Sequence, residues 1–245
     1  MRMRALRASL LLGIALELAA PPMARATPPP PCVLRVPQVP FISTALQDSL
    51  NIWDGGINVL ADQMNWPFFQ SSVSSTQDFT LLMEDGMQAP GDVIGVYNGG
   101  VPGKFFPVFP DYASSGWFAS FSFRASGALW IYLFDNNANF QGLTTHSGAD
   151  RYHIGFYVQN ATGTYYSQDL LNPGSAPQAL TYAGTGANTG AVWECFQNAP
   201  YSAGTSTYTG AVLLVQAYQG IGFPPFQCAT PARTTTWGSL KAIYR

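Results

Sequence analysis

The stretch WFASFSFRASGALWIYLF, residues 117–134, decides the class of fold that this sequence predicts. From Trp117 to Arg124, aromatic residues alternate with alanine and serine, which is the period-two pattern of a half-buried β-strand. A second apolar run from Ala128 to Phe134 predicts another strand, and the small residues between the two runs are typical of a turn. The stretch therefore indicates β-structure on both sides of a turn.

Similar strand signals, separated by turn clusters, recur along most of the chain. We expect further strands at about residues 57–60, 79–83, 93–97, 104–109, 154–159, 179–182, 192–196 and 211–217. One stretch has apolar residues at steps of three and four, which predicts a short helix at about 44–53, capped by Ser43 or Thr44 and ended by Gly55-Gly56. The sequence therefore predicts an all-β fold, a two-sheet antiparallel sandwich or jelly roll with one short N-terminal helix.

Composition supports the same class and argues against one kind of partner. Beyond residue 26 the chain has seven basic and 12 acidic residues, which gives a formal charge of −5. Nucleic-acid binding is disfavoured because a phosphate backbone calls for a basic surface. Glu84 and Glu194 are the only glutamates in this part of the chain, whereas surface helices usually draw on many Glu and Lys residues.

The first 26 residues have the form of a secretory signal peptide. A basic start precedes an apolar run at residues 8–20, and Ala24-Arg25-Ala26 fits a small-x-small cleavage site. The run is too short for a membrane span, so we expect a secreted or cell-surface protein without a membrane span in its mature chain. The expected plan is a signal peptide at 1–26, a Pro-rich leader outside the core at 27–40, one β-sandwich domain at 41–228, and a final strand or a short sorting-like tail at 229–245.

Three cysteines would enter an oxidising compartment after export. One disulfide and one free thiol are expected from Cys32, Cys195 and Cys228. We favour Cys195–Cys228 because both lie in the β-rich C-terminal part. The pairing Cys32–Cys228 and three buried free thiols are the alternatives, and a catalytic cysteine is poorly supported because neither histidine lies near one in sequence.

Oxygen-bearing side chains at alternate positions follow the strand that ends at Phe134. Asp135, Asn137 and Asn139 resemble the first half of a calcium loop. The glycine and glutamate that complete such a loop are replaced by Phe140 and His146. Asp and Asn side chains that bond to their own backbone explain the same residues, so we favour a turn over a calcium site.

The segment HSGADRYH, residues 146–153, places two histidines around Asp150. A metal site would need a third ligand from elsewhere, and the spacing is not the i, i+4 spacing of helical zinc sites. We expect His153 at the start of a strand and His146 in a loop, without a bound metal.

Motifs for catalysis are absent from the sequence, and no catalytic residue is predicted. There is no G-x-S-x-G, no H-E-x-x-H and no Gly-rich phosphate loop. A glycosidase needs two carboxyls that face one bond, and Glu84, Asp85 and Glu194 are the candidates that a fold could bring together. Six Trp and 12 Tyr could supply a platform for stacking sugars, although aromatic residues alternating within strands are more often part of a core.

Several segments resemble a family of secreted bacterial domains of unknown function, many of them from proteins with PEP-CTERM-like export tails. The resemblance lies in INVLADQMNWPFF, FTLLMEDG, GDVIGVYNGGVPGKFFPVFPDYASSGW, HIGFYVQNATGTYYSQDLLNPGSAPQALTY and the WECFQNAPYS region, and it covers most of residues 44–218. It implies a late motif of the form D-x-D-F/Y-N-D before an apolar strand, whose acids would bind calcium.

The motif is degenerate in this chain. Gln197 and Asn198 stand at two acid positions after Phe196, and Tyr208 stands at the aromatic position. The remaining ligand positions are taken by Thr205, Thr207, Thr209 and Gly210. Because these residues are neutral, the resemblance implies at most weak calcium affinity and no other cofactor.

Three functions follow from these expectations. The first is a secreted or surface-displayed β-sandwich that acts as a non-catalytic binding or structural module for an extracellular ligand or surface component such as a glycan. The second is a carbohydrate-binding domain or a carbohydrate-active enzyme. The third is an adhesin that calcium stabilises through Asp135, Asn137 and Asn139.

Overall fold

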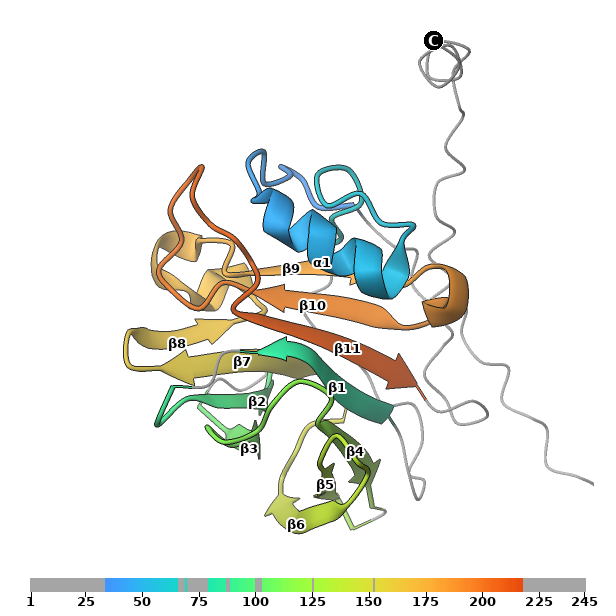
Figure 1. Ribbon diagram of the computed structural model, residues 1–245. Helices are drawn as coiled ribbons and strands as arrows, with labels where there is room; N and C mark the ends of the chain where they lie inside the picture. The colour runs from blue at the N-terminus through green and yellow to red at the C-terminus, as the bar shows by residue number, and fades with distance from the viewer. Residues whose placement is uncertain are drawn as a thin grey trace, which may run out of the picture.

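The computed structural model describes residues 34–65, 69, 79–86, 89–99, 103–124, 126–151 and 153–217. These residues form two antiparallel β-sheets and one α-helix, so the predicted all-β sandwich is confirmed (Figure 1). Strands predicted at 128–134, 192–196 and 211–217 have those bounds in the structure. The helix α1 runs from Thr44 to Asp54 and is capped by the Ser43 hydroxyl, which accepts from the Ala45 N–H at 3.2 Å.

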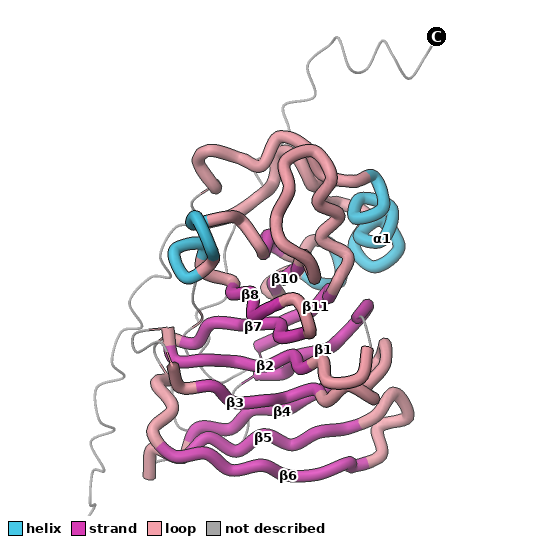
Figure 2. Tube along the Cα trace, turned by 90° about the vertical axis from the view of Figure 1, so that its left-hand side faces the viewer, coloured by secondary structure: helices cyan, strands magenta, loops and turns pink. Residues whose placement is uncertain are grey.

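The larger sheet, sheet A, has seven strands in the order β6-β5-β4-β1-β11-β10-β9. Figure 2 shows β6 at the lower rim of the molecule. The bounds are β1 Phe79–Gly86, β4 Phe118–Phe123, β5 Ala128–Phe134, β6 Phe140–Ser147, β9 Ala179–Ala183, β10 Val192–Phe196 and β11 Ala211–Ala217.

The smaller sheet, sheet B, has four strands in the order β3-β2-β7-β8. The bounds are β2 Val93–Asn98, β3 Phe105–Phe109, β7 Ile154–Asn160 and β8 Gly163–Tyr166. The main hydrophobic core lies between the two sheets and takes every second residue of their strands, as the period of a β-strand requires. Phe79 of β1 and Phe121 of β4 stack within it, with ring centroids 4.2 Å apart.

A second core lies on the other face of sheet A, where α1 covers β9, β10 and β11 (Figure 1). Leu46 and Leu50 of the helix are fully buried there, and Trp193 of β10 packs with them. The end of the helix is fixed by Asp54, whose carboxylate accepts from the Trp193 indole N–H at 2.8 Å and from the Thr185 backbone N–H at 2.8 Å. The helix thus makes the sandwich three layers deep at one end.

Three features of the local structure differ from the prediction. Residues 57–60 form turns and not a strand, because the Asn58 side chain accepts from the N–H groups of Leu60 and Ala61 at 3.0 and 3.1 Å. Strands β6 and β8 are present without having been predicted, since neither has a continuous apolar run. The leader does not lie wholly outside the core, because Val39 is buried in the second core and exchanges hydrogen bonds with the Gln63 side chain.

Two glycines of sheet B let two tyrosines lie flat across neighbouring strands. Tyr97 of β2 is paired with Gly155 of β7, and Tyr157 of β7 is paired with Gly95 of β2. A Cβ atom at Gly95 would lie 2.6 Å from both the Tyr157 ring and the Phe106 carbonyl oxygen. The tyrosines are 1% and 2% exposed, so their rings close the outer face of the sheet.

Candidate functional site

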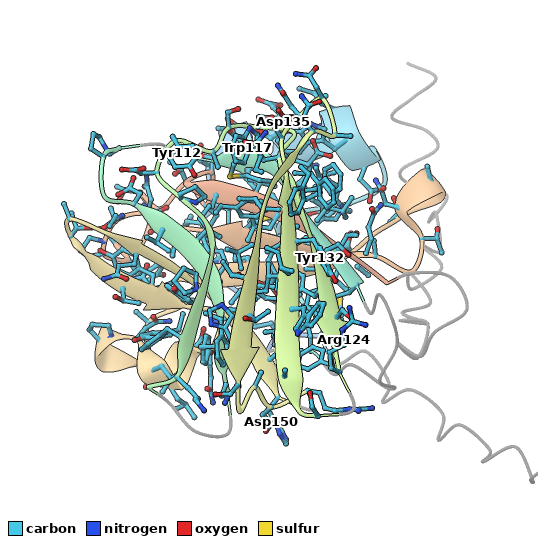
Figure 3. The ribbon with its side chains drawn as sticks, turned by 90° about the horizontal axis from the view of Figure 1, so that it is seen from below. Tyr112, Trp117, Arg124, Tyr132, Asp135 and Asp150 are labelled. Carbon is cyan, nitrogen blue, oxygen red and sulfur yellow. The ribbon has the colours of Figure 1, made fainter. Side chains whose placement is uncertain are left out.

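The outer face of β4, β5 and β6 carries a row of aromatic side chains, which we call the aromatic strip. Its members are Phe118, Trp130, Tyr132, Phe134 and Phe140. Their place follows from the alternation of the strands, because Leu129 and Ile131 point into the core and leave the even-numbered residues of β5 on the other face. In Figure 3, Tyr132 and Arg124 lie together along the flank of these strands, on the side away from β3.

Arg124 is held against one end of the aromatic strip by two contacts. Its guanidinium carbon lies 4.1 Å from the centroid of the Trp130 ring, a cation–π geometry. Its Nη2 donates to the Tyr132 hydroxyl at 2.9 Å. Its Nε is buried and has no hydrogen-bond partner among the described residues. The planar cation is therefore fixed in orientation, and the bond to Tyr132 uses one of the five N–H donors of a guanidinium.

The other end of the strip is a stack of phenylalanines. The Phe118 and Phe134 rings stack with centroids 4.8 Å apart, and Phe140 meets Phe134 at 5.8 Å. Phe140 is 59% exposed, and its neighbour Leu143 on β6 is 42% exposed. The strip therefore changes from hydrogen-bonding groups at Arg124 to an apolar surface near β6.

The predicted calcium residues Asp135, Asn137 and Asn139 form a closed turn at the end of β5. One carboxylate oxygen of Asp135 accepts from the backbone N–H groups of Asn137 and Asn139, both at 2.9 Å. The other accepts from the side-chain amides of Asn139 and Gln141 at 3.0 and 2.9 Å. These donors lower the pKa of Asp135. The turn interpretation therefore accounts for all three residues.

In the late loop that resembles a calcium motif, a side-chain oxygen likewise accepts hydrogen bonds from backbone N–H groups. Gln197 Oε1 accepts from the backbone N–H groups of Thr207 and Tyr208 at 2.8 and 3.0 Å. The Thr209 hydroxyl donates to the Thr207 hydroxyl at 3.3 Å, whereas the Thr205 hydroxyl donates to the Ser202 carbonyl. Backbone N–H groups that point to the centre of a loop repel a cation.

Two further motif positions support the same loop from its side. The Asn198 carbonyl accepts from the Asn160 side chain at 2.6 Å. Gly210 packs directly against Asn198, where a Cβ atom would lie 2.6 Å from the Asn198 nitrogen. Both residues therefore have a packing role in the structure.

If these two loops bind no calcium, the melting temperature should not change when calcium or a chelator is added. The physical reason is that their side-chain oxygens already accept protein N–H groups, which an ion would have to displace. Scanning calorimetry of the protein in EDTA and in millimolar calcium checks this expectation. A substantial rise in the melting temperature with calcium would restore the adhesin hypothesis.

The three acids considered for glycoside hydrolysis are not placed as a pair across a cleft. Glu194 points into the core between the sheets and is fully buried. Its Oε1 accepts from the Thr181 hydroxyl at 2.9 Å, and its Oε2 has no hydrogen-bond partner in the part of the chain that the structure describes. Burial raises its pKa well above 4.5. Glu84 and Asp85 belong to β1, which β11 separates from β10.

An ion pair closes the edge of the sandwich near Glu194. Arg35 of the N-terminal segment pairs with Asp169, which follows β8. Desolvation raises the pKa of Asp169, and Arg35 partly offsets that effect. The pair links the N-terminal segment to the segment after β8, and the charge of Arg35 also favours the ionised form of Glu194.

One of the two histidines is placed differently from the prediction. His146 belongs to β6 and not to a loop, and its ring lies 5.0 Å from the Phe106 ring. Burial lowers its pKa. His153 directly precedes β7, and its Nδ1 lies 2.9 Å from Asp150. Within the described ranges no three His, Cys, Asp or Glu residues are grouped so that they could hold a metal.

Cys195 is a free, fully buried thiol on β10, and burial raises its pKa. Cys32 and Cys228 lie outside the described residues. The favoured Cys195–Cys228 pairing and the alternative Cys32–Cys228 therefore fall at least partly outside the described residues. No helix in that part is long and apolar enough to cross a membrane.

No family model, no curated protein and no solved structure matches the chain significantly.

Proposed function

We propose that this chain is a non-catalytic, secreted or surface-displayed module that binds a glycan on the aromatic strip. The observation that carries the proposal is the fixed group of Arg124, Trp130 and Tyr132 beside the stacked phenylalanines. A sugar ring has an apolar face of C–H groups and a rim of hydroxyls. Aromatic faces suit the first and oriented hydrogen-bonding groups suit the second.

The polar groups near the strip complement the hydroxyl rim of a sugar. Thr145 of β6 lies opposite Trp130 and is exposed. Arg124 offers several N–H donors in one plane, which can donate to either hydroxyl or carboxylate oxygens. These groups lie on rigid strands, so little conformational entropy is lost when a ligand binds.

Two rival functions have less support. A carbohydrate-active enzyme would need two carboxyls facing one bond, and the enclosed side chain of Glu194 cannot reach a substrate without opening the core. A calcium-stabilised adhesin would need free oxygen ligands, whereas Asp135 and Gln197 accept N–H groups. The export signal and the resemblance to secreted bacterial domains remain predictions that agree with an extracellular glycan as the ligand.

The proposal is tested by incubating the purified protein with a panel of soluble and insoluble polysaccharides. We expect retention by at least one polysaccharide and no release of reducing ends from any of them. The panel should contain neutral chains and chains with uronic acids, because Arg124 could select for the carboxylate. Retention by none of them, or steady release of sugars, would contradict the proposal.

A further inference from the structure

The two sheets have four edge strands, which differ in how well they are protected. They are β6 and β9 in sheet A and β3 and β8 in sheet B. An edge strand presents unpaired N–H and C=O groups to any other extended chain, so proteins usually shield it.

Three of these edge strands have a feature that hinders pairing with another chain. The edge of β9 is covered where the Met64 N–H donates to the Thr181 carbonyl at 2.8 Å. Strand β3 has five residues and contains Pro107, which lacks the N–H that a partner would use. Strand β8 has only four residues, and short edge strands recruit partners poorly.

Strand β6 lacks all of these features. It has eight residues, FQGLTTHS, with no proline and no Lys, Arg, Asp or Glu. It lies at the rim of the molecule (Figure 2), and in the part of the chain that the structure describes only β5 pairs with it. Its side chains are largely exposed, including Phe140 and Leu143.

The register of the sheet identifies which backbone groups of β6 point outward. The Arg124 N–H donates to the Ala128 carbonyl, so alternate residues of β5 from Ala128 onward bond to β4. Leu129, Ile131 and Leu133 therefore bond to β6, through its residues 142, 144 and 146. The N–H and C=O groups of Leu143, Thr145 and Ser147 are left facing outward.

We propose that two copies of the chain associate by antiparallel pairing of β6 with β6 of the second copy. An uncharged strand suits itself as a partner, because no like charges meet across the two-fold axis. Pairing satisfies the outward backbone groups of both strands and covers the exposed Leu143. It also continues sheet A, so that the outer faces that carry the two aromatic strips lie on the same side of one larger sheet. The proposal does not depend on what the strip binds.

The test uses two substitutions at Thr145, the middle residue of the three that face outward. Thr145→Pro removes an outward N–H that the β5–β6 ladder does not use, and its ring occupies the gap a partner would fill. Thr145→Val keeps the N–H and is the matched control. The dissociation constant of the dimer is measured by analytical ultracentrifugation over a wide range of concentrations.

We expect a dimer for the wild type and for T145V, and a dissociation constant raised by about tenfold or more in T145P. If T145P does not fold, the dissociation constant of Thr145→Lys is measured instead, because a lysine on an edge strand also opposes pairing. A monomeric wild type overturns the proposal, even if it binds an unrelated extended peptide. A dimer that both T145P and T145K leave unchanged also overturns it.

Discussion

Alanine in place of Gly95 is expected to lower the free energy of unfolding by about 1–3 kcal/mol or more, the range found for overpacked cores. The added methyl group would lie 2.6 Å from the Phe106 carbonyl oxygen and from the Tyr157 ring. The carbonyl belongs to the neighbouring strand β3 and cannot move without breaking the register. For a domain of this size a loss of about 1–3 kcal/mol should lower the melting temperature by about 2–12 °C.

Tyr157 cannot relieve the clash by swinging outward. Phe105 meets its ring edge-on at 5.1 Å, and Tyr166 of β8 is its cross-strand partner. Burial raises the pKa of Tyr157 to about 12, which reflects the same enclosure. A buried ring of this kind holds its rotamer, so the strain remains in the folded state.

Gly142→Ala is the matched control, because Gly142 also lies in a strand and has no atom within 4 Å of an added Cβ. Alanine is expected to leave stability unchanged or slightly raised there, since it restricts the unfolded chain. Thermal and denaturant unfolding of both variants measure the difference. Equal effects at Gly95 and Gly142 would show that the close approach of Tyr157 does not constrain sheet B.

Glu194→Gln is expected to make the protein more stable than the wild type at neutral and alkaline pH. Burial raises the folded-state pKa of Glu194 well above its ordinary value of 4.5. The folded protein therefore holds a proton that the unfolded chain has lost, and stability falls as the pH rises above 4.5. Glutamine keeps a neutral side chain of the same shape and removes this dependence.

The size of the effect follows from linkage. Between pH 4.5 and the folded pKa of Glu194, the wild type should lose about 1.4 kcal/mol per pH unit relative to the variant. Other groups, such as Asp169 and His146, titrate in both proteins and largely cancel in the difference. Thr181 and Arg35 interact with Glu194 and favour its charged form, so both residues must remain unchanged in the comparison.

Urea unfolding at a series of pH values from 4 to 9 measures the difference directly. Below pH 4.5 the two proteins should have nearly the same stability, because Glu194 is then protonated in both states. Parallel stability curves for wild type and E194Q across the whole range would show that Glu194 is charged in the folded protein. That result would also reopen its candidacy as a catalytic acid or base.

The sheets were predictable from sequence where one face of a strand is buried. The run LWIYLF, residues 129–134, shows why the strand is easier to find than its function. All six of its residues are apolar or aromatic, so the pattern predicts a strand without saying which face is outside. Trp130, Tyr132 and Phe134 alternate with aliphatic residues, and this alternation is the sequence signal that the three share one face of the strand. Alternating aromatic residues are more often part of a core, so the sequence alone does not place these three on the outer face.

Other features depended on contacts distant in sequence. β6 could not be predicted because its residues FQGLTTHS alternate weakly and gain their order by pairing with β5. The partnership of Arg124 with Trp130 and Tyr132 requires the β4–β5 register, which the sequence does not specify. The enclosure of Glu194 depends on the layers that cover β10 on both faces, the second sheet on one and α1 on the other, and these contacts are distant in sequence.

Calorimetric titration of one glycan into two variants tests most directly whether the aromatic strip is the binding surface. Trp130→Ala removes the ring over which the Arg124 guanidinium lies. The control, Tyr112→Ala, removes a tyrosine that is 70% exposed and lies at the end of the strands (Figure 3). With the polysaccharide that the wild type retains, or an oligosaccharide of it, we expect W130A to bind about tenfold more weakly or worse. Y112A should bind as the wild type does. Unchanged affinity in a folded W130A variant would contradict the account.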